Sequence, residues 1–204
     1  AAGELFAQQN PDSVPIRLIA ELAGVKTALI HYHFGNREGL IRAVVKHVIE
    51  QWRENPVEQY LAENRHLFET TDGKRQLVSD LIHLLYEAIY PKGNATWPNV
   101  LAMQAVYRNY SFRDEIIEAA ISPCLTAFLT TFRTITGNED SDSAHCWFIA
   151  ILTPALLLAT NPDIFQQISH PTQSGYAFYR RMEHTCIQNA LSGVGSVSYT
   201  HLTL

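Results

Sequence analysis

The stretch ELAGVKTALIHYHFGNREGL, residues 21–40, decides the fold of the first part of this 204-residue chain. Gly24 divides it, because glycine readily adopts the left-handed conformation that ends a helix. Before the glycine, Ile16, Ile19 and Ala20 have the spacing of the buried stripe of a helix. After it, the sequence predicts a short helix over about residues 26–34. Two short helices joined by a tight turn are a candidate helix-turn-helix, whose second helix enters the major groove of DNA.

Four ring side chains follow one another at residues 31–34, and four successive side chains on a helix cannot all face one core. We expect Phe34 to face inward, together with Val25 and Ile30. We expect His31 and Tyr32 to face outward, where they can reach bases or phosphates. The row of rings therefore indicates a helix with one packed face and one contacting face.

Three segments of the chain resemble the tetracycline-repressor (TetR) family of bacterial transcription regulators. They are AAGELFAQQ at residues 1–9, IAELAGV at 19–25 and ALIHYHFGNREGL at 28–40. The resemblance implies an all-α protein that forms a homodimer. It implies a helix-turn-helix domain followed by a larger helical ligand-binding and dimerisation domain. Beyond Trp52 the resemblance is architectural only.

The resemblance also implies which residues meet double-stranded DNA. Thr27 and Ala28 lie where the family reads base edges, and Arg17 lies where some members place a base-contacting arginine. Lys26 stands where the family often has a capping serine, and Leu29 is placed to touch a thymine methyl group. The implied DNA-binding residues are Arg17, Lys26, Thr27, Ala28, Leu29, His31, Tyr32, His33 and Arg37.

The rest of the chain has the period of helices, and strand-like alternation is rare. Helical segments are predicted at about residues 74–90, 97–110, 112–135, 143–160 and 175–191, giving about nine helices in all. The predicted domains are a helix-turn-helix domain at 1–46, whose first helix we expect to be truncated, and a ligand-binding and dimerisation domain at 47–192. Residues 197–204 back-translate to a string like a sequencing adapter, so we expect a non-native tail there; an ordinary polar tail is the alternative.

Composition excludes several classes of function. The net charge is −5, and residues 1–54 hold six basic and six acidic side chains, so global charge gives no argument for nucleic-acid binding. The three cysteines lack metal-ligand spacing and indicate a reduced, cytoplasmic protein. No catalytic motif occurs, so we expect neither an enzyme nor a bound cofactor or metal ion. Residues 146–159 are too short and interrupted to indicate a membrane span.

Two apolar regions predict the assembly and the effector. Residues 145–159 are apolar nearly all round, which favours a dimer interface with the final helix, although a central core helix is the alternative. The expected interface residues are Trp147, Ile149, Leu152, Leu156, Phe178 and Met182. Large rings in the middle helices could line a pocket for a small, mostly apolar effector, although plain core packing is the alternative. The expected ligand-binding residues are Tyr86, Tyr90, Trp97, Met103, Tyr107, Phe128 and Phe132.

Together these features predict a dimeric transcription factor, most simply a repressor that binds a palindromic operator and is released by a small molecule. The alternative is a small-molecule-binding helical dimer that has lost DNA binding, which the neutral charge of residues 1–54 favours.

Overall fold

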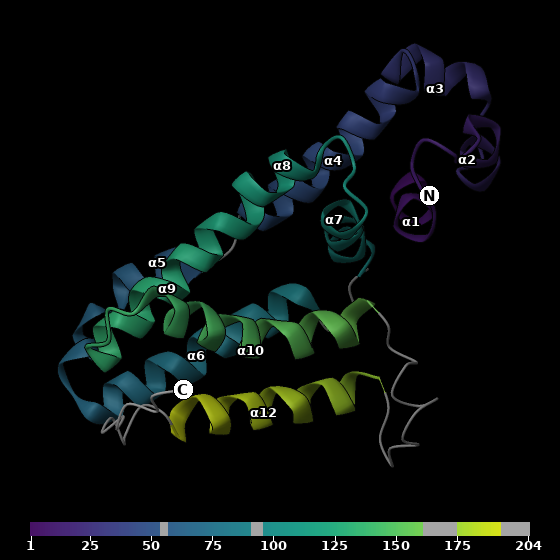
Figure 1. Cartoon of the computed structure of the whole chain (residues 1–204). Helices are drawn as coiled ribbons and strands as arrows, with labels where there is room; N and C mark the ends of the chain where they lie inside the picture. The colour runs from purple at the N-terminus through teal and green to yellow at the C-terminus, as the bar shows by residue number, and fades with distance from the viewer. Residues whose placement is uncertain (54–56, 91–95, 161–174, 193–204) are drawn as a thin grey trace. The chain divides into compact units, whose positions relative to one another are not determined.

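The structure is a computed structural model that describes residues 1–53, 57–90, 96–160 and 175–192. Every regular element within these ranges is a helix, which confirms the predicted all-α class (Figure 1). The predicted tail at residues 197–204 lies outside the described residues. The chain divides into two compact units, which we describe separately.

The first unit comprises residues 1–54 and 95–121, so α7 and α8 belong to the same unit as the N-terminal helices. We had predicted one boundary near residue 46, and the unit takes in a segment from beyond it. Within this unit α1 packs against α7, and α4 packs against α3, α7 and η2. Its elements are α1 (Ala2–Gln8), α2 (Ile16–Leu22), α3 (Thr27–Phe34), α4 (Arg37–Arg53), α7 (Trp97–Tyr107), α8 (Arg113–Ile116) and a π-helical turn η2 (Ile117–Ile121).

A continuous apolar core holds the first unit together. Helix α1 contributes Leu5 and Phe6, and α4 contributes Val45 and Val48, all of them buried. From α7, Leu101 closes the same core. The helices that carry the predicted helix-turn-helix therefore pack against α7, a helix that follows them in the chain by more than 40 residues.

The second unit comprises residues 55–94 and 122–204. Helices α6, α10 and α12 pack against one another, and α9 packs against α10 and α5. In Figure 1, α10 and α12 run side by side. The elements are α5 (Val57–Glu63), a 3₁₀ helix η1 (Arg65–Glu69), α6 (Thr71–Ile89), α9 (Ser122–Thr136), α10 (Ser141–Thr160) and α12 (Tyr176–Ser192).

Helix α6 forms the centre of the second unit. Its Leu81, Leu85 and Tyr86 are fully buried. The hydroxyl of Tyr86 donates to the sulfur of Cys186 at 3.0 Å, and the hydroxyl of Tyr179 donates to the carbonyl oxygen of Tyr86 at 2.8 Å. The hydroxyls of Tyr86 and Tyr179 are thus paired inside the unit, as burial of a polar group requires.

Helix α10 is long and apolar enough, by length and composition, to cross a membrane. Core helices of soluble proteins pass the same test, and one such helix is weak support for a span. Its ring side chains pack inside the unit, where Phe148 and Trp147 lie 5.2 and 5.9 Å from the ring centre of Phe128. The packing of these rings accounts for the apolar composition of one side of the helix.

Candidate nucleic-acid interface

The turn between α2 and α3 is built by backbone hydrogen bonds around Gly24. The amide of Val25 donates to the carbonyl oxygen of Ala20 at 2.9 Å, and the amide of Gly24 donates to the carbonyl oxygen of Glu21 at 3.1 Å. This pair of bonds is the Schellman arrangement that ends a helix. Gly24 has φ +67°, a conformation that glycine adopts without strain. The predicted turn between two short helices is therefore present.

Helix α3 has two faces with different surroundings. Ile30 is 6% exposed and packs into the core of the first unit, whereas Tyr32 is 82% exposed. Helical spacing places Thr27, Ala28 and His31 on the same side of α3 as Tyr32, and Ala28 and His31 are exposed. The expectation that His31 and Tyr32 face outward agrees with this arrangement, and Thr27 lies on the same face.

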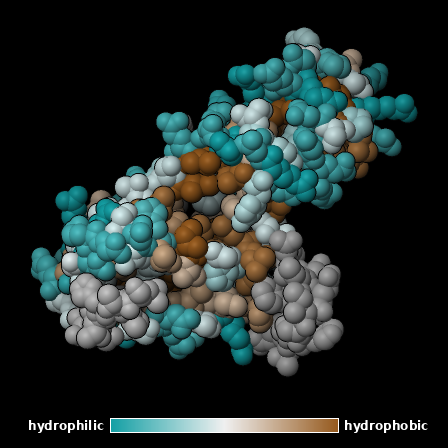
Figure 2. All heavy atoms as spheres, viewed as in Figure 1, coloured by the Kyte–Doolittle hydropathy of each residue, from teal (hydrophilic) through white to brown (hydrophobic). Residues whose placement is uncertain are grey.

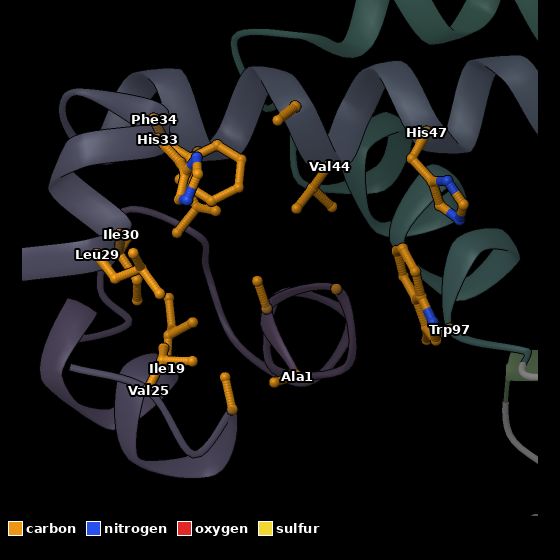
Figure 3. A pocket seen from close by; sticks show the side chains of 15 residues that line it. Ala1, Ile19, Val25, Leu29, Ile30, His33, Phe34, Val44, His47 and Trp97 are labelled. Carbon is orange, nitrogen blue, oxygen red and sulfur yellow. The ribbon is translucent and has the colours of Figure 1, made fainter. Parts of the chain in front are cut away.

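The other side of α3 borders an apolar pocket within the first unit, with a volume of about 520 Å³ (Figure 3). Leu29, His33 and Phe34 line it together with Val44 of α4 and Trp97 of α7. Leu29 and His33 are exposed but lie on the pocket side of the helix, one turn apart. Because they occupy this side, they do not share the face of Thr27 and Tyr32. Val25 and Phe34, expected as inward anchors, are 37% and 39% exposed at the edge of this pocket.

The N-terminal helices also match a known protein family. Residues 1–44 match the family model described as bacterial regulatory proteins, tetR family. This span contains α1, the Gly24 turn and all of α3. The N-terminal segment of the chain is that of a TetR-family transcriptional regulator.

Whole-chain structural comparison shows that the TetR resemblance in fold extends past the helix-turn-helix. A candidate TetR-family transcriptional regulator from Mesorhizobium loti MAFF303099, a crystal structure at 1.54 Å resolution, matches with a TM-score of 0.51. The two proteins share 18% sequence identity over 94% of this chain and 91% of the other. At this identity the match supports the fold. A search of curated proteins gave no match.

Positive charge in the N-terminal part of the chain is local rather than general. Arg17 on α2 and Lys26 at the start of α3 are exposed. On α4, by contrast, Arg42 pairs with Glu38 at 2.7 Å and Lys46 lies 3.7 Å from Glu50. These exposed pairs neutralise much of the charge of α4. Lys26, by contrast, directly precedes Thr27 of α3, and Arg17 lies on the neighbouring helix α2. On the face drawn in Figure 2, the part of the first unit that holds α2 and α3 is mostly hydrophilic.

Arg37, expected to contact phosphate, has a different environment from Arg17 and Lys26. It is half-buried at the first position of α4, and its Nη1 donates to the carbonyl oxygens of Pro11 and Val14. Sequence reasoning missed this contact. The residue before it caps α4: the Asn36 side chain accepts from the amide of Gly39 at 2.9 Å.

The rings expected to bind an effector fall into separate groups. Trp97 stacks on His47 in the first unit, at 5.8 Å between ring centres, and Tyr107 is 76% exposed there. Met103, also on α7, is half-buried. In the second unit Tyr86 and Tyr90 each lie 5.0 Å from the ring of Tyr179. The remaining two rings pack against Trp147 in the same unit and are buried, namely Phe128 and Phe132.

The residues expected at a dimer interface also divide by environment. Ile149 is 54% exposed on α10, whereas Leu156 is buried within the unit. Trp147 and Leu152 are half-buried, as are Phe178 and Met182 on α12. Among the residues that the structure describes, no group of three or more His, Cys, Asp or Glu side chains is placed to hold a metal ion.

Proposed function

We propose that this TetR-family regulator is a cytoplasmic repressor whose homodimer binds a palindromic operator and leaves it when a small, mostly apolar effector binds. The observation that carries the DNA-binding part is the outward face of α3, where Thr27, Ala28, His31 and Tyr32 lie together. Lys26, directly before Thr27, and Arg17, on the neighbouring helix α2, are exposed and supply positive charge. Thr27 and Ala28 are proposed to meet base edges, and Tyr32 and Lys26 to meet phosphates.

The proposed dimer surface is an exposed apolar stripe on α10. Ile149 is 54% and Leu157 36% exposed. Ala150 and Thr153 are exposed between them, and Cys146 is exposed three residues before Ile149. Large exposed aliphatic side chains in a row are unfavourable in water and typical of a surface that another molecule covers. A second copy is the occupant we propose, because two copies of α3 related by two-fold symmetry would read two half-sites of a palindrome.

The proposed interface keeps Ile149 and adds Leu157. Three other expected interface residues are buried or half-buried within their own unit, namely Trp147, Leu152 and Leu156. We propose that they hold α10 in place rather than contact the second copy. Phe178 and Met182 on α12 remain candidates at its edge, since α12 packs beside α10.

The proposed effector is aromatic or aliphatic with few polar groups. The support is chemical: the rings of Tyr90, Tyr176 and Tyr179 lie together in the second unit and offer an apolar wall to a ligand. Polar groups lie beside them, because Glu87 accepts from the Tyr176 hydroxyl and pairs with Arg180. Tyr90 is half-buried beside Tyr176 and Tyr179, which makes it the ring of this set most able to contact a ligand. An effector can release DNA only if it binds one conformation of the dimer better than the other.

The charge balance of residues 1–54 supports the second candidate, a small-molecule-binding dimer without DNA binding. Residues 1–54 have no net charge, and Arg42 and Lys46 are paired with acidic side chains. One experiment separates the two functions. Selection of duplexes from a randomised pool, followed by salt-dependent binding, should return a palindrome for a repressor. A chain that selects no duplex but still binds small molecules would instead be the second kind of protein.

A further inference from the structure

Arg37 joins the two ends of the helix-turn-helix through its side chain. It lies at the start of α4, just after α3. Its Nη1 donates to the carbonyl oxygen of Pro11, 3.3 Å away and 26 residues earlier, and more closely to that of Val14. Val14 directly precedes Pro15, the residue that caps α2. One guanidinium therefore connects the entry into α2 with the exit from α3.

The two carbonyl oxygens that Arg37 contacts lie in a buried part of the chain. Pro11 is buried, and Val14 is fully buried in the apolar core of the first unit. In the part of the chain that the structure describes, the backbone bonds of the turn and of the first turn of α2 use Asn10 and Pro15 as acceptors, not Pro11 or Val14. A buried carbonyl without a donor is costly, so the guanidinium supplies bonds that this turn needs.

The surroundings of Arg37 disfavour a phosphate contact. The charged residues that line a pocket of about 470 Å³ in the first unit are Arg37, Arg42, Asp12, Glu38 and Glu115. Three carboxylates against two guanidinium groups leave this pocket with a net negative charge, which disfavours a phosphate and favours keeping the Arg37 guanidinium against the protein. Arg42, one turn further along α4, is exposed and already paired with Glu38.

We propose that Arg37 is a positioning residue, which fixes the angle of α2 and α3 to α4 and thereby presents the outward face of α3 to DNA, without touching DNA itself. The expected effect of Arg37 on DNA affinity rests on the proposed DNA-binding function. The two hydrogen bonds from Arg37 to Pro11 and Val14, which we call the Arg37 clamp, exist in the protein without DNA. The two parts can therefore be tested separately.

The first arm of the test uses the full chain without DNA. Hydrogen–deuterium exchange of the amides of residues 16–22 should become several-fold faster in Arg37→Ala, because α2 loses its tie to α4. The matched control is Arg42→Ala, which removes the same charge from an exposed position of the same helix and should leave this exchange unchanged. Equal exchange in wild type and Arg37→Ala would overturn the proposal whatever the chain does with DNA.

The second arm measures binding to a palindromic duplex selected by the wild-type chain, at several salt concentrations and at a temperature where every variant is folded. Arg37→Ala should bind about tenfold more weakly, with the same slope of log affinity against log salt as wild type. A slope reduced by about 0.9 per half-site would mean that Arg37 neutralises a phosphate, and would overturn the proposal. Unchanged affinity in a folded variant would overturn it as well, because a residue that only stabilises the fold does not alter binding by molecules that remain folded.

Arg37→Lys provides the second variant if Arg37→Ala does not fold. It keeps the charge on a shorter side chain with one nitrogen, so exchange and affinity should lie between those of wild type and a broken clamp. Wild-type exchange and affinity in Arg37→Lys would contradict the clamp. If no duplex is selected at all, the DNA-binding function fails, while the exchange arm still decides whether Arg37 holds α2.

Discussion

Ile30 and Tyr32 lie two residues apart in α3 and face opposite ways: Ile30 is 6% exposed and Tyr32 82%. One face of α3 therefore packs on the core of the first unit, and the opposite face is free to contact another molecule. Thr27, Ala28 and His31 lie on the side of Tyr32, whereas Leu29 and His33 border the pocket. The proposed contact with DNA therefore falls on four side chains of α3.

Two variants on the outward face should have different effects. Thr27→Ala should relax preference at one or two positions in each half-site, because a base-edge contact contributes about 1–3 kcal/mol of discrimination. Tyr32→Phe should weaken binding to every duplex by a similar factor, because a phosphate contact carries no sequence information. Binding to a cognate and a scrambled duplex measures both effects.

Leu29→Ala is the matched control for these variants, since it truncates a side chain on the pocket side of the same helix. It should leave sequence preference as in wild type. If Leu29→Ala alters base preference and Thr27→Ala does not, the face that meets DNA is not the one described.

The proposed dimer predicts the effect of a charge on α10. Ile149→Arg would place an unpaired charge in an apolar interface, which is strongly unfavourable. Size-exclusion chromatography with light scattering should show a dimer for wild type and a monomer for the variant. Leu22→Arg introduces the same group at an equally exposed leucine of the first unit, 59% against 54% for Ile149, and should remain dimeric. A dimeric Ile149→Arg would place the interface elsewhere.

The junction of α3 and α4 predicts unequal effects of two alanine substitutions. A Cβ at Gly39 would lie 2.0 Å from the carbonyl oxygen of Phe34, and backbone would have to move to admit it. Gly39→Ala should lower the free energy of unfolding by about 1–3 kcal/mol. At Gly24 a Cβ meets nothing within 4 Å, and only the φ of +67° is unfavourable, a cost of about 1 kcal/mol. Denaturant unfolding that ranks Gly24→Ala as the more damaging change would contradict this account of the junction.

Buried tyrosines predict a loss of stability at alkaline pH. Burial raises the pKa of the Tyr86 and Tyr179 hydroxyls above their ordinary value. In the unfolded chain these hydroxyls lose protons near pH 10, so the folded chain binds more protons above that pH. The free energy of unfolding is therefore unaffected by this difference below about pH 10 and falls as pH rises beyond it.

Tyr179→Phe should make that alkaline decrease shallower by the contribution of one proton. At about pH 8, where both hydroxyls stay neutral in either state, the variant should differ from wild type only by the lost hydrogen bond to Tyr86. Urea unfolding at about pH 8 and pH 11 provides the comparison. An equally steep alkaline decrease in both chains would show that the Tyr179 hydroxyl does not contribute.

The helix-turn-helix was predictable because its signals are local. Gly24 ends α2, Asn36 caps α4, and the positions of Ile30 and Tyr32 follow from the period of a helix. Leu29 and His33 were assigned to DNA by resemblance alone. His33 and Phe34 lie three and four residues after Ile30, which was expected to face inward, and Leu29 lies one turn before His33, so helical spacing indicates the pocket side.

Other features could not be read from the sequence because they depend on distant partners. The clamp of Arg37 involves backbone carbonyls 23 and 26 residues away, and carbonyls carry no sequence signal. The grouping of α7 with the N-terminal helices depends on core contacts such as Leu101. Helix α5 was not predicted. In the sequence, a ring that forms core, such as Phe128, looks the same as one that lines a ligand site.

Salt-dependent binding to a selected duplex tests the central claim most directly. The full chain should select a two-fold symmetric site, and its affinity should fall by about a hundredfold or more when the salt concentration rises fourfold, because several phosphates are neutralised per dimer. Thr27→Ala should bind the selected site more weakly and a scrambled one as before. A chain that selects no symmetric site, or whose binding does not depend on salt, would contradict the account of α3 as the helix that reads DNA.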